Sequence, residues 1–144
     1  MMTTKIRAMK EDDINDVMDI WLAENLSAHH FIDENYWKNN KNKVQSLILK
    51  AKTFVYEEDE EIKGFIGLSG NYIEGLFVKS EYQRNGIGKE LLKHCKNIFW
   101  SLILKVYSEN EAAVNFYEKN SFFERDKMYN ADTGKTELYM EWIR

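Results

Sequence analysis

The sequence predicts a single α/β domain of the α+β type over residues 1–144, with a central mixed, mostly antiparallel sheet of about seven strands and about four flanking helices. The length suits one domain, and 44% apolar residues are enough to build a core. Apolar residues alternate in some segments and recur every three or four positions in others. Three strand-like segments in the middle of the chain lie too close together for helical crossovers, so they predict antiparallel hairpins.

The first half of the chain predicts one strand, two helices and then three strands. Asp12 and Asp13 precede a helical apolar pattern, where negative charge suits the positive end of the helix dipole. The acidic run from Glu57 to Glu61 separates two β-like segments and predicts a solvated hairpin turn. The expected elements are a strand at 4–9, a helix containing 14–22, a helix at 34–52, and strands at 53–57, 61–69 and 71–78.

The second half predicts two more helices and three more strands. An apolar stripe from Ile87 to Phe99 has helical spacing. Ser108 and Glu111 have the spacing of a capping box, which predicts that Ser108 opens a helix that runs through Glu118. The order is then β-α-α-β-β-β-α-β-α-β-β. The remaining expected elements are strands at 102–107, 122–129 and 136–143, with a turn at 132–134.

Composition and charge argue against several classes of protein. The formal charge of −4 makes a nucleic acid or an anionic membrane an unfavourable partner. The longest apolar stretch, 98–104, is far shorter than the roughly 20 residues of a membrane span, and the first residues lack the apolar core of a signal peptide. Cys95 is the only cysteine, which excludes an intrachain disulfide and a Cys-rich metal cluster. We therefore expect a cytoplasmic protein with no nucleic-acid or membrane partner.

A glycine-containing loop between a strand and a helix carries the clearest chemical signal. The strand ends near Val78, and Gly86 and Gly88 stand at the start of the long helix. The first N–H groups of a helix lack intrahelical acceptors, the helix dipole adds positive charge, and glycine lets a phosphate approach the backbone. Arg84 and Lys89 add formal positive charge. The segment therefore predicts a loop that binds a pyrophosphate.

Two other phosphate-binding loops do not fit the spacing. A Walker loop requires Gly and a hydroxyl residue at the positions of Gln83 and Glu90. The dinucleotide-binding pattern requires a third Gly at the position of Leu91 and an early βαβ unit. The spacing that does fit is Gln/Arg-x-x-Gly-x-Gly, from Gln83 to Gly88.

This pattern resembles the pyrophosphate loop of the GNAT N-acetyltransferase superfamily, in its small bacterial members. The segment from Asn110 to Phe122 is similar to the second signature of that family, Asn-x-x-Ala-x-x-Phe-Tyr-Glu-Lys-x-Gly-Phe, with Ser121 in place of the usual Gly. The two signatures stand in family order, and the predicted elements follow the family topology over almost the whole chain. The resemblance implies the GNAT fold and an acetyl-CoA-dependent N-acetyltransferase.

The resemblance also implies roles for individual residues. The acetyl group would pass directly to a primary amine, with no covalent enzyme intermediate and no metal. Tyr117 would protonate the leaving thiolate, and a backbone N–H of the strand before the loop would polarise the thioester carbonyl. The implied cofactor-binding residues are Leu76, Phe77, Val78, Arg84, Asn85, Gly86, Ile87, Gly88, Lys89, Asn110 and Tyr117.

The catalytic base is indicated by elimination. Some family members have a Glu on the fifth strand, five residues before the motif Asn, where this sequence has Lys105. Glu74 is the candidate that remains, and it shares a face with Leu76 and Val78 if the strand is regular and has no bulge. The alternative interpretation of Glu74 is an exposed or ion-paired strand residue. Likewise, the alternative interpretation of Tyr117 is a tyrosine that only packs in the core.

The segment between the first two helices borders the acceptor site in the family. His29 and Phe31 are therefore candidate substrate-binding residues. Adjacent imidazoles such as those of His29 and His30 do not both reach one ion, and no partner lies at ligand spacing, so we expect no metal. We expect a small-molecule or peptide amine as the acceptor, and a monomer or a homodimer. The alternatives are a non-catalytic acyl-CoA sensor on the same fold and a toxin that acetylates aminoacyl-tRNA.

Overall fold

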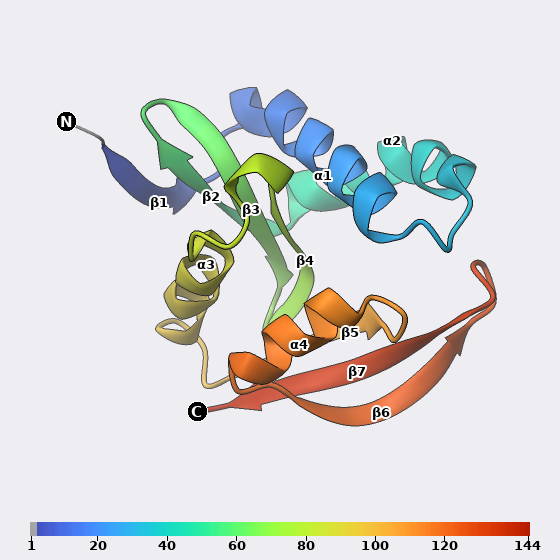
Figure 1. The fold of residues 1–144 in the computed structure, drawn as a ribbon. Coiled ribbons are helices and arrows are strands. Elements are labelled where there is room, and N and C mark those ends of the chain that lie inside the picture. The colour runs from blue at the N-terminus through green and yellow to red at the C-terminus, as the bar shows by residue number, and fades with distance from the viewer. Residues whose placement is uncertain (1–2) are drawn as a thin grey trace.

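The computed structural model describes residues 3–144 and confirms the predicted fold class and element order (Figure 1). These residues form one seven-stranded sheet in the order β1-β2-β3-β4-β5-β7-β6, in which β4 and β5 are the parallel pair. The strands are β1 (Thr4–Ala8), β2 (Lys52–Glu58), β3 (Glu61–Ser69), β4 (Tyr72–Val78), β5 (Ser101–Tyr107), β6 (Phe123–Asn130) and β7 (Lys135–Ile143). The helices are α1 (Ile14–Ala28), α2 (Glu34–Lys50), α3 (Ile87–Lys96) and α4 (Glu111–Lys119), with short 3-10 helices η1 (Glu11–Asp13) and η2 (Ser80–Tyr82).

The helices cover both faces of the sheet and enclose two apolar cores. Helices α3 and α4 pack on one face, where Leu91, Cys95 and Tyr117 meet strand residues such as Leu104. Helices α1 and α2 pack on the other face, where Val17 and its neighbours are buried. Burial raises the pKa of the Cys95 thiol to about 12, so this side chain is a packing residue rather than a reactive thiol.

The parallel pair holds the two halves of the sheet together over a short distance. β4 and β5 pair at Tyr72 with Ile103 and at Ile73 with Leu104, and the two strands separate beyond these pairs. Figure 1 shows β1–β4 and β5–β7–β6 diverging as two half-sheets. As a result, β4 has a paired edge against β3 as far as Val78 but no strand partner on its other edge after Ile73.

A β-bulge interrupts β4 at the point where it leaves β5. The register between β3 and β4 shifts between Gly67 and Leu68, which leaves Glu74 as the extra residue. Ile73 and Leu76 consequently pack into the same core, although a regular strand would direct them to opposite faces. The bulge therefore sets which β4 side chains enter the core.

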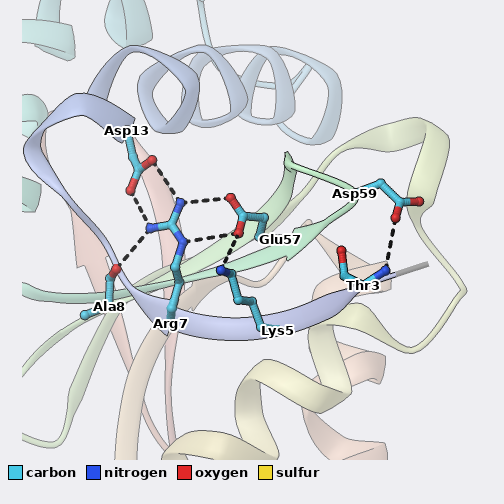
Figure 2. Close-up of polar contacts among 7 residues, drawn as sticks. All are labelled: Thr3, Lys5, Arg7, Ala8, Asp13, Glu57 and Asp59. Carbon is cyan, nitrogen blue, oxygen red and sulfur yellow. Dashed lines mark hydrogen bonds and ion pairs between the residues drawn. The ribbon is translucent and has the colours of Figure 1, made fainter. Parts of the chain in front are cut away.

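Charged side chains fix β1 to the rest of the sheet (Figure 2). The guanidinium of Arg7 lies between the carboxylates of Asp13 and Glu57, with nitrogen–oxygen distances of 2.7 and 3.1 Å for the ion pairs. Lys5 makes a further ion pair with Glu57. Arg7 holds the pKa of the Asp13 carboxyl below its usual range. The acidic run at Glu57–Glu61 forms the β2–β3 hairpin turn, as predicted. The carboxylates of Glu57, Glu58 and Glu61 pair with lysines and Arg7, whereas Asp59 and Glu60 at the tip of the turn are exposed.

One local prediction is wrong. Helix α4 begins at Glu111, and its N-cap is Asn110, whose side-chain oxygen accepts from the Ala113 N–H at 3.2 Å. The Ser108 hydroxyl instead donates to the Thr136 carbonyl, so Ser108 does not open the helix. Asn is as good an N-cap as Ser, and the strand β5 ends at Tyr107, which leaves Ser108 in the connecting turn. None of the helices in residues 3–144 is long and apolar enough to cross a membrane.

Candidate active site

The separation of β4 and β5 opens a cleft of about 220 Å³ between the two half-sheets. Its walls come from α1, α2, β4, β5, β7 and α4, so segments from the whole length of the chain meet there. Among residues 3–144, no group of three or more His, Cys, Asp or Glu side chains is arranged to hold a metal ion. Of the predicted site residues, those that line the cleft are His29, Glu74, Leu76, Phe77, Asn110 and Tyr117.

The loop before α3 leaves its backbone donors free. Arg84 and Gly86 both have left-handed backbone conformations, with φ of 67° and 84°. This alternation turns successive N–H groups toward one side, as in the anion-binding nests of other proteins. In the described chain, none of the backbone N–H groups from Arg84 to Lys89 has a protein acceptor. The loop therefore presents a series of unpaired backbone N–H donors at the N-terminus of α3.

The side chains of this loop divide between solvent and core. Arg84, Asn85 and Lys89 are exposed, whereas Ile87 is buried and anchors the first turn of α3. Gly88 lies against α4, where a Cβ atom would approach the Phe116 ring at 3.0 Å. The positive charges of Arg84 and Lys89 thus stand beside the free N–H groups without obstructing them.

The unpaired edge of β4 connects this loop to the cleft. Leu76, Phe77 and Val78 are half-buried, and the backbone on their β5 side has no strand partner. The side chains of Leu76 and Val78 pack on one core and that of Phe77 on the other. Backbone N–H and C=O groups along this edge are available to an extended ligand.

Tyr117 is buried on α4, and its ring packs edge-on against Phe116 and Phe122. Its hydroxyl has no hydrogen-bond partner among the described residues, and the residue lines the cleft. Burial raises the pKa of the phenol well above its usual value, so the hydroxyl keeps its proton at neutral pH. Tyr117 can therefore donate a hydrogen bond into the cleft.

Glu74 occupies the bulge of β4 and is exposed at the cleft. Because the strand is not regular here, the shared face expected for Glu74, Leu76 and Val78 does not hold. Because Glu74 is the extra residue of the bulge, its side chain is not part of the regular alternation of β4 side chains between the two faces of the sheet, and it lies at the mouth of the cleft. Glu74 makes no ion pair among the described residues.

Sequence reasoning missed a second carboxylate in the cleft. Glu137 comes from β7, is half-buried and accepts a hydrogen bond from the Asn130 side chain at 3.1 Å. Burial, followed by the charges of Glu74 and Glu137, raises the pKa of Tyr72 to about 12. Lys105, on β5, also lines the cleft. No local motif marks Glu137, because it reaches the cleft only through the pairing of β5 with β7.

His29 connects α1 to the N-terminus of α4. Its Nε2 lies 3.1 Å from Nδ2 of Asn110. Because the oxygen of the Asn110 amide accepts from the Ala113 N–H, the Asn110 amide nitrogen is the donor and Nε2 of His29 is the acceptor. The imidazole is therefore neutral, with its proton on Nδ1. Burial lowers the pKa of His29 to about 4, which agrees with this state.

Aromatic rings form the wall of the cleft around His29. The imidazole stacks on Trp37 at a centroid distance of 5.1 Å and meets Tyr107 edge-on at 5.2 Å. Trp21 from α1 adds a further ring to the cleft wall. Phe31 packs edge-on against His29 at 5.5 Å but does not line the cleft, so of the two candidate substrate residues only His29 reaches it. Trp21 and Trp37 carry no sequence signal that distinguishes a residue of the cleft wall from a core residue.

The fold and the cleft define an acetyltransferase of the GNAT type. The family model described as the Acetyltransferase (GNAT) family matches residues 14–122, and the chain belongs to this family. The protein is therefore an enzyme that transfers acetyl groups to amines, and a non-catalytic sensor role is not favoured.

Two curated relatives and a solved structure match almost the full chain. The peptidyl-lysine N-acetyltransferase YiaC of Escherichia coli K12 is 30% identical over 139 residues, which cover 95% of each chain. The peptidyl-lysine N-acetyltransferase YjaB of the same organism is 27% identical over 93% of this chain and 92% of that protein. The apo-form solution structure of E. coli YjaB superposes with a TM-score of 0.86, at 24% identity and 97% coverage of each chain.

Proposed function

We propose that the enzyme is a single catalytic domain that uses acetyl-CoA to acetylate the ε-amino group of a lysine in a peptide or protein. One structural feature supports the proposal, namely a continuous path from the cleft to the loop before α3. The unpaired edge of β4 leads from the cleft, where Glu74 and Tyr117 lie, to the free N–H groups of residues 84–89.

The loop fits the pyrophosphate of acetyl-CoA. Its free backbone donors, the dipole of α3 and the charges of Arg84 and Lys89 all favour an anion. Gly86 leaves open space on the side where a Cβ would stand. The edge of β4 at 76–78 has no strand partner on its β5 side and offers hydrogen bonds to the amides of the pantetheine arm, although the Val78 carbonyl already accepts one from the Gln83 side chain.

The residues at the cleft supply the steps of direct acetyl transfer. A backbone N–H on the free edge of β4 polarises the thioester carbonyl and stabilises the oxyanion that forms when the amine attacks. Tyr117 donates its hydroxyl hydrogen to the departing sulfur. Because burial raises its pKa, the phenol keeps its proton and stabilises the developing thiolate as a hydrogen-bond donor.

The cleft suits a cationic amine. Two carboxylates, Glu74 and Glu137, and one lysine, Lys105, line it, and aromatic rings form one wall. A lysine ammonium, with an ordinary pKa of about 10.4, must lose a proton before it can attack. Glu74 accepts that proton, directly or through water. The names of the two E. coli relatives, both peptidyl-lysine N-acetyltransferases, support lysine over a small-molecule amine.

The test compares three classes of acceptor. Peptides with one lysine and a blocked N-terminus, peptides with a free N-terminus and no lysine, and polyamines are each incubated with acetyl-CoA, and acetylation is followed by mass spectrometry. We expect turnover of the lysine peptides to exceed that of the others. Preferential acetylation of the free N-terminus or of polyamines would contradict the lysine assignment.

Tyr117→Phe serves as the matched variant in this assay. It keeps the ring and its packing and removes the hydroxyl, so kcat should fall about 10²-fold while acetyl-CoA affinity changes little. If the variant turns over like the wild type, Tyr117 is a core residue and not a donor to the leaving group.

A further inference from the structure

A buried carboxylate on α1 holds the segment that leads into the proposed pyrophosphate loop. Glu24 is 8% exposed. Its oxygens accept hydrogen bonds from the Ser80 N–H at 3.0 Å, from the Ser80 hydroxyl at 2.9 and 3.0 Å, and from the Gln83 amide at 2.9 Å. All of these donors belong to the four residues that immediately precede Arg84.

Within residues 3–144, no cation lies close enough to form an ion pair with Glu24. Among the described residues, none of the ion pairs includes it. A buried carboxylate without a cation is costly unless hydrogen bonds replace its hydration. Here only neutral donors from Ser80 and Gln83 do so, which makes the conformation of that segment and the burial of Glu24 mutually dependent.

Gln83 links Glu24 to the end of β4 and to the start of the loop. Its amide nitrogen donates to Glu24 and also to the Val78 carbonyl at the end of β4, 2.9 Å away. The next residue, Arg84, already has the left-handed conformation of the free-donor loop. The carboxylate therefore sets where the loop stands relative to the β4 edge.

The negative charge of Glu24 distinguishes two roles, namely electrostatic attraction of a ligand and positioning of the loop through hydrogen bonds. A negative charge near an anion-binding loop repels the anion, so Glu24 cannot raise affinity for a phosphate by electrostatic attraction. Any favourable contribution has to come from the geometry that its hydrogen bonds impose. Helix α1 also carries Trp21 and Asn25 on the cleft wall, so the same contact joins the proposed cosubstrate and acceptor sites.

We propose that Glu24 is a positioning residue for acetyl-CoA binding, which acts by fixing Ser80 and Gln83 and through them the backbone donors of residues 84–89. The proposal rests on the proposed function, because it takes these donors to be the pyrophosphate site. Ser80 and Gln83 are the groups through which Glu24 acts, and Glu24 itself touches neither substrate.

Calorimetric titration with coenzyme A tests the proposal on four variants. Glu24→Gln removes the charge and turns an acceptor into a donor, and Glu24→Asp keeps the charge but shortens the reach to Ser80 and Gln83. Both should weaken coenzyme A binding about tenfold or more, because charge-assisted hydrogen bonds that order the loop are lost. Asp19→Asn removes a charge from the exposed face of α1 and should leave the affinity unchanged.

Ser80→Ala perturbs the same contact more mildly, so it tests the proposal if either Glu24 variant fails to fold. It deletes one donor to Glu24 and should weaken binding by about threefold to fivefold. At saturating acetyl-CoA, kcat of the folded variants should stay within about threefold of wild type, because the reacting groups are untouched. A role in stability alone would lower the melting temperature and leave the coenzyme A affinity of the folded protein unchanged.

The outcomes separate the two proposals. If the wild type binds coenzyme A and the folded Glu24 and Ser80 variants bind it equally well or more tightly, the positioning role is overturned and the proposed function stands. Weakening in Glu24→Gln but not in Glu24→Asp would still support positioning, because the removal of a repelling charge cannot by itself weaken the binding of an anion. If the wild type itself does not bind coenzyme A, the proposed function fails and the positioning role fails with it.

Discussion

Glu74 and Glu137 reach the cleft from different strands and have different surroundings. Glu74 stands in the β4 bulge and makes no ion pair within residues 3–144, whereas Glu137 accepts a hydrogen bond from Asn130. In our mechanism only Glu74 takes the proton from the acceptor. Both carboxylates attract the ammonium form of a lysine before it reacts.

Glu74→Gln removes charge and basicity at nearly constant shape. We expect kcat/KM for a lysine peptide to fall by about 10²-fold or more, and the rise of rate to move to higher pH, where free amine already exists. Glu137→Gln is the matched control, and it should raise KM with a much smaller effect on kcat. A pH–rate profile of Glu74→Gln that overlays the wild type at every pH would assign deprotonation to a water chain or to bulk solvent.

His29 makes a separate prediction about stability in mild acid. The unfolded chain binds a proton at His29 near pH 6.5, whereas the folded protein keeps the ring neutral down to a pKa of about 4. The unfolded state therefore binds more protons between these values, and stability falls as pH decreases from about 6.5 to about 4. The loss should amount to roughly 1–3 kcal/mol.

Urea unfolding at pH 7.5, 6, 5 and 4.5 measures this loss. His29→Gln cannot take up a proton and can still accept from the Asn110 amide, so its stability should change less over this range. The pKa of Asp13 is lowered, so its contribution is lost only as pH falls below the ordinary aspartate range, outside this window. An identical pH dependence in wild type and His29→Gln would show that the ring is not held neutral.

At the scale of elements, the loop before α3 combines a strained backbone with free donors. Gly86 has φ of 84°, a conformation that a side chain makes costly, and it faces open space where the proposed pyrophosphate approaches. Gly86→Val should weaken coenzyme A binding by roughly 2–4 kcal/mol of lost charge-assisted contacts, measured by calorimetry.

Gly134→Val controls for the cost of the backbone conformation alone. Gly134 also has a left-handed φ, of 70°, but lies in the β6–β7 turn, away from the loop. This variant should lose roughly 1–2 kcal/mol of stability and bind coenzyme A like the wild type. If Gly86→Val folds and binds coenzyme A with wild-type affinity, the loop is not the pyrophosphate site.

For the whole molecule, the narrow connection between β4 and β5 makes ligand binding a stabilising event. The two half-sheets share two residue pairs, and a coenzyme A molecule on the β4 edge would contact groups that are otherwise unpaired. At about 100 times its dissociation constant, a ligand adds about 2.7 kcal/mol to stability. For a chain of this length that corresponds to a rise in melting temperature of roughly 5–10 °C.

Thermal unfolding with and without coenzyme A checks this expectation. Gly86→Val should show no rise in melting temperature with coenzyme A. Gly134→Val should have a lower melting temperature than the wild type without the ligand and should show the same rise with it. Equal melting temperatures for the wild type with and without a saturating concentration of coenzyme A would contradict binding to the folded state.

Local sequence was sufficient to predict the elements and to locate a candidate binding loop between β4 and α3. Hydrophobic spacing predicted the strands, helices and their order because burial on one face imposes a period of two or of about 3.6. The proposed pyrophosphate loop was identified from local sequence, since a helix start, two glycines and two basic residues lie within six consecutive positions, from Arg84 to Lys89, and its ligand stays a prediction. The Ser108 cap failed because Asn110 is a competing cap two residues later.

Tertiary structure determined where the remaining residues of the candidate site lie and which groups they contact. The bulge that places Glu74, the hydrogen bond from Asn110 to His29 across 81 positions, the arrival of Glu137 from β7, and the contact of Glu24 with Ser80 across 56 positions all depend on strand register and helix packing. Such contacts join residues far apart in sequence, so no periodicity or motif encodes them locally. The sequence by itself determined the family chemistry, and the folded chain determined which carboxylates and rings surround it.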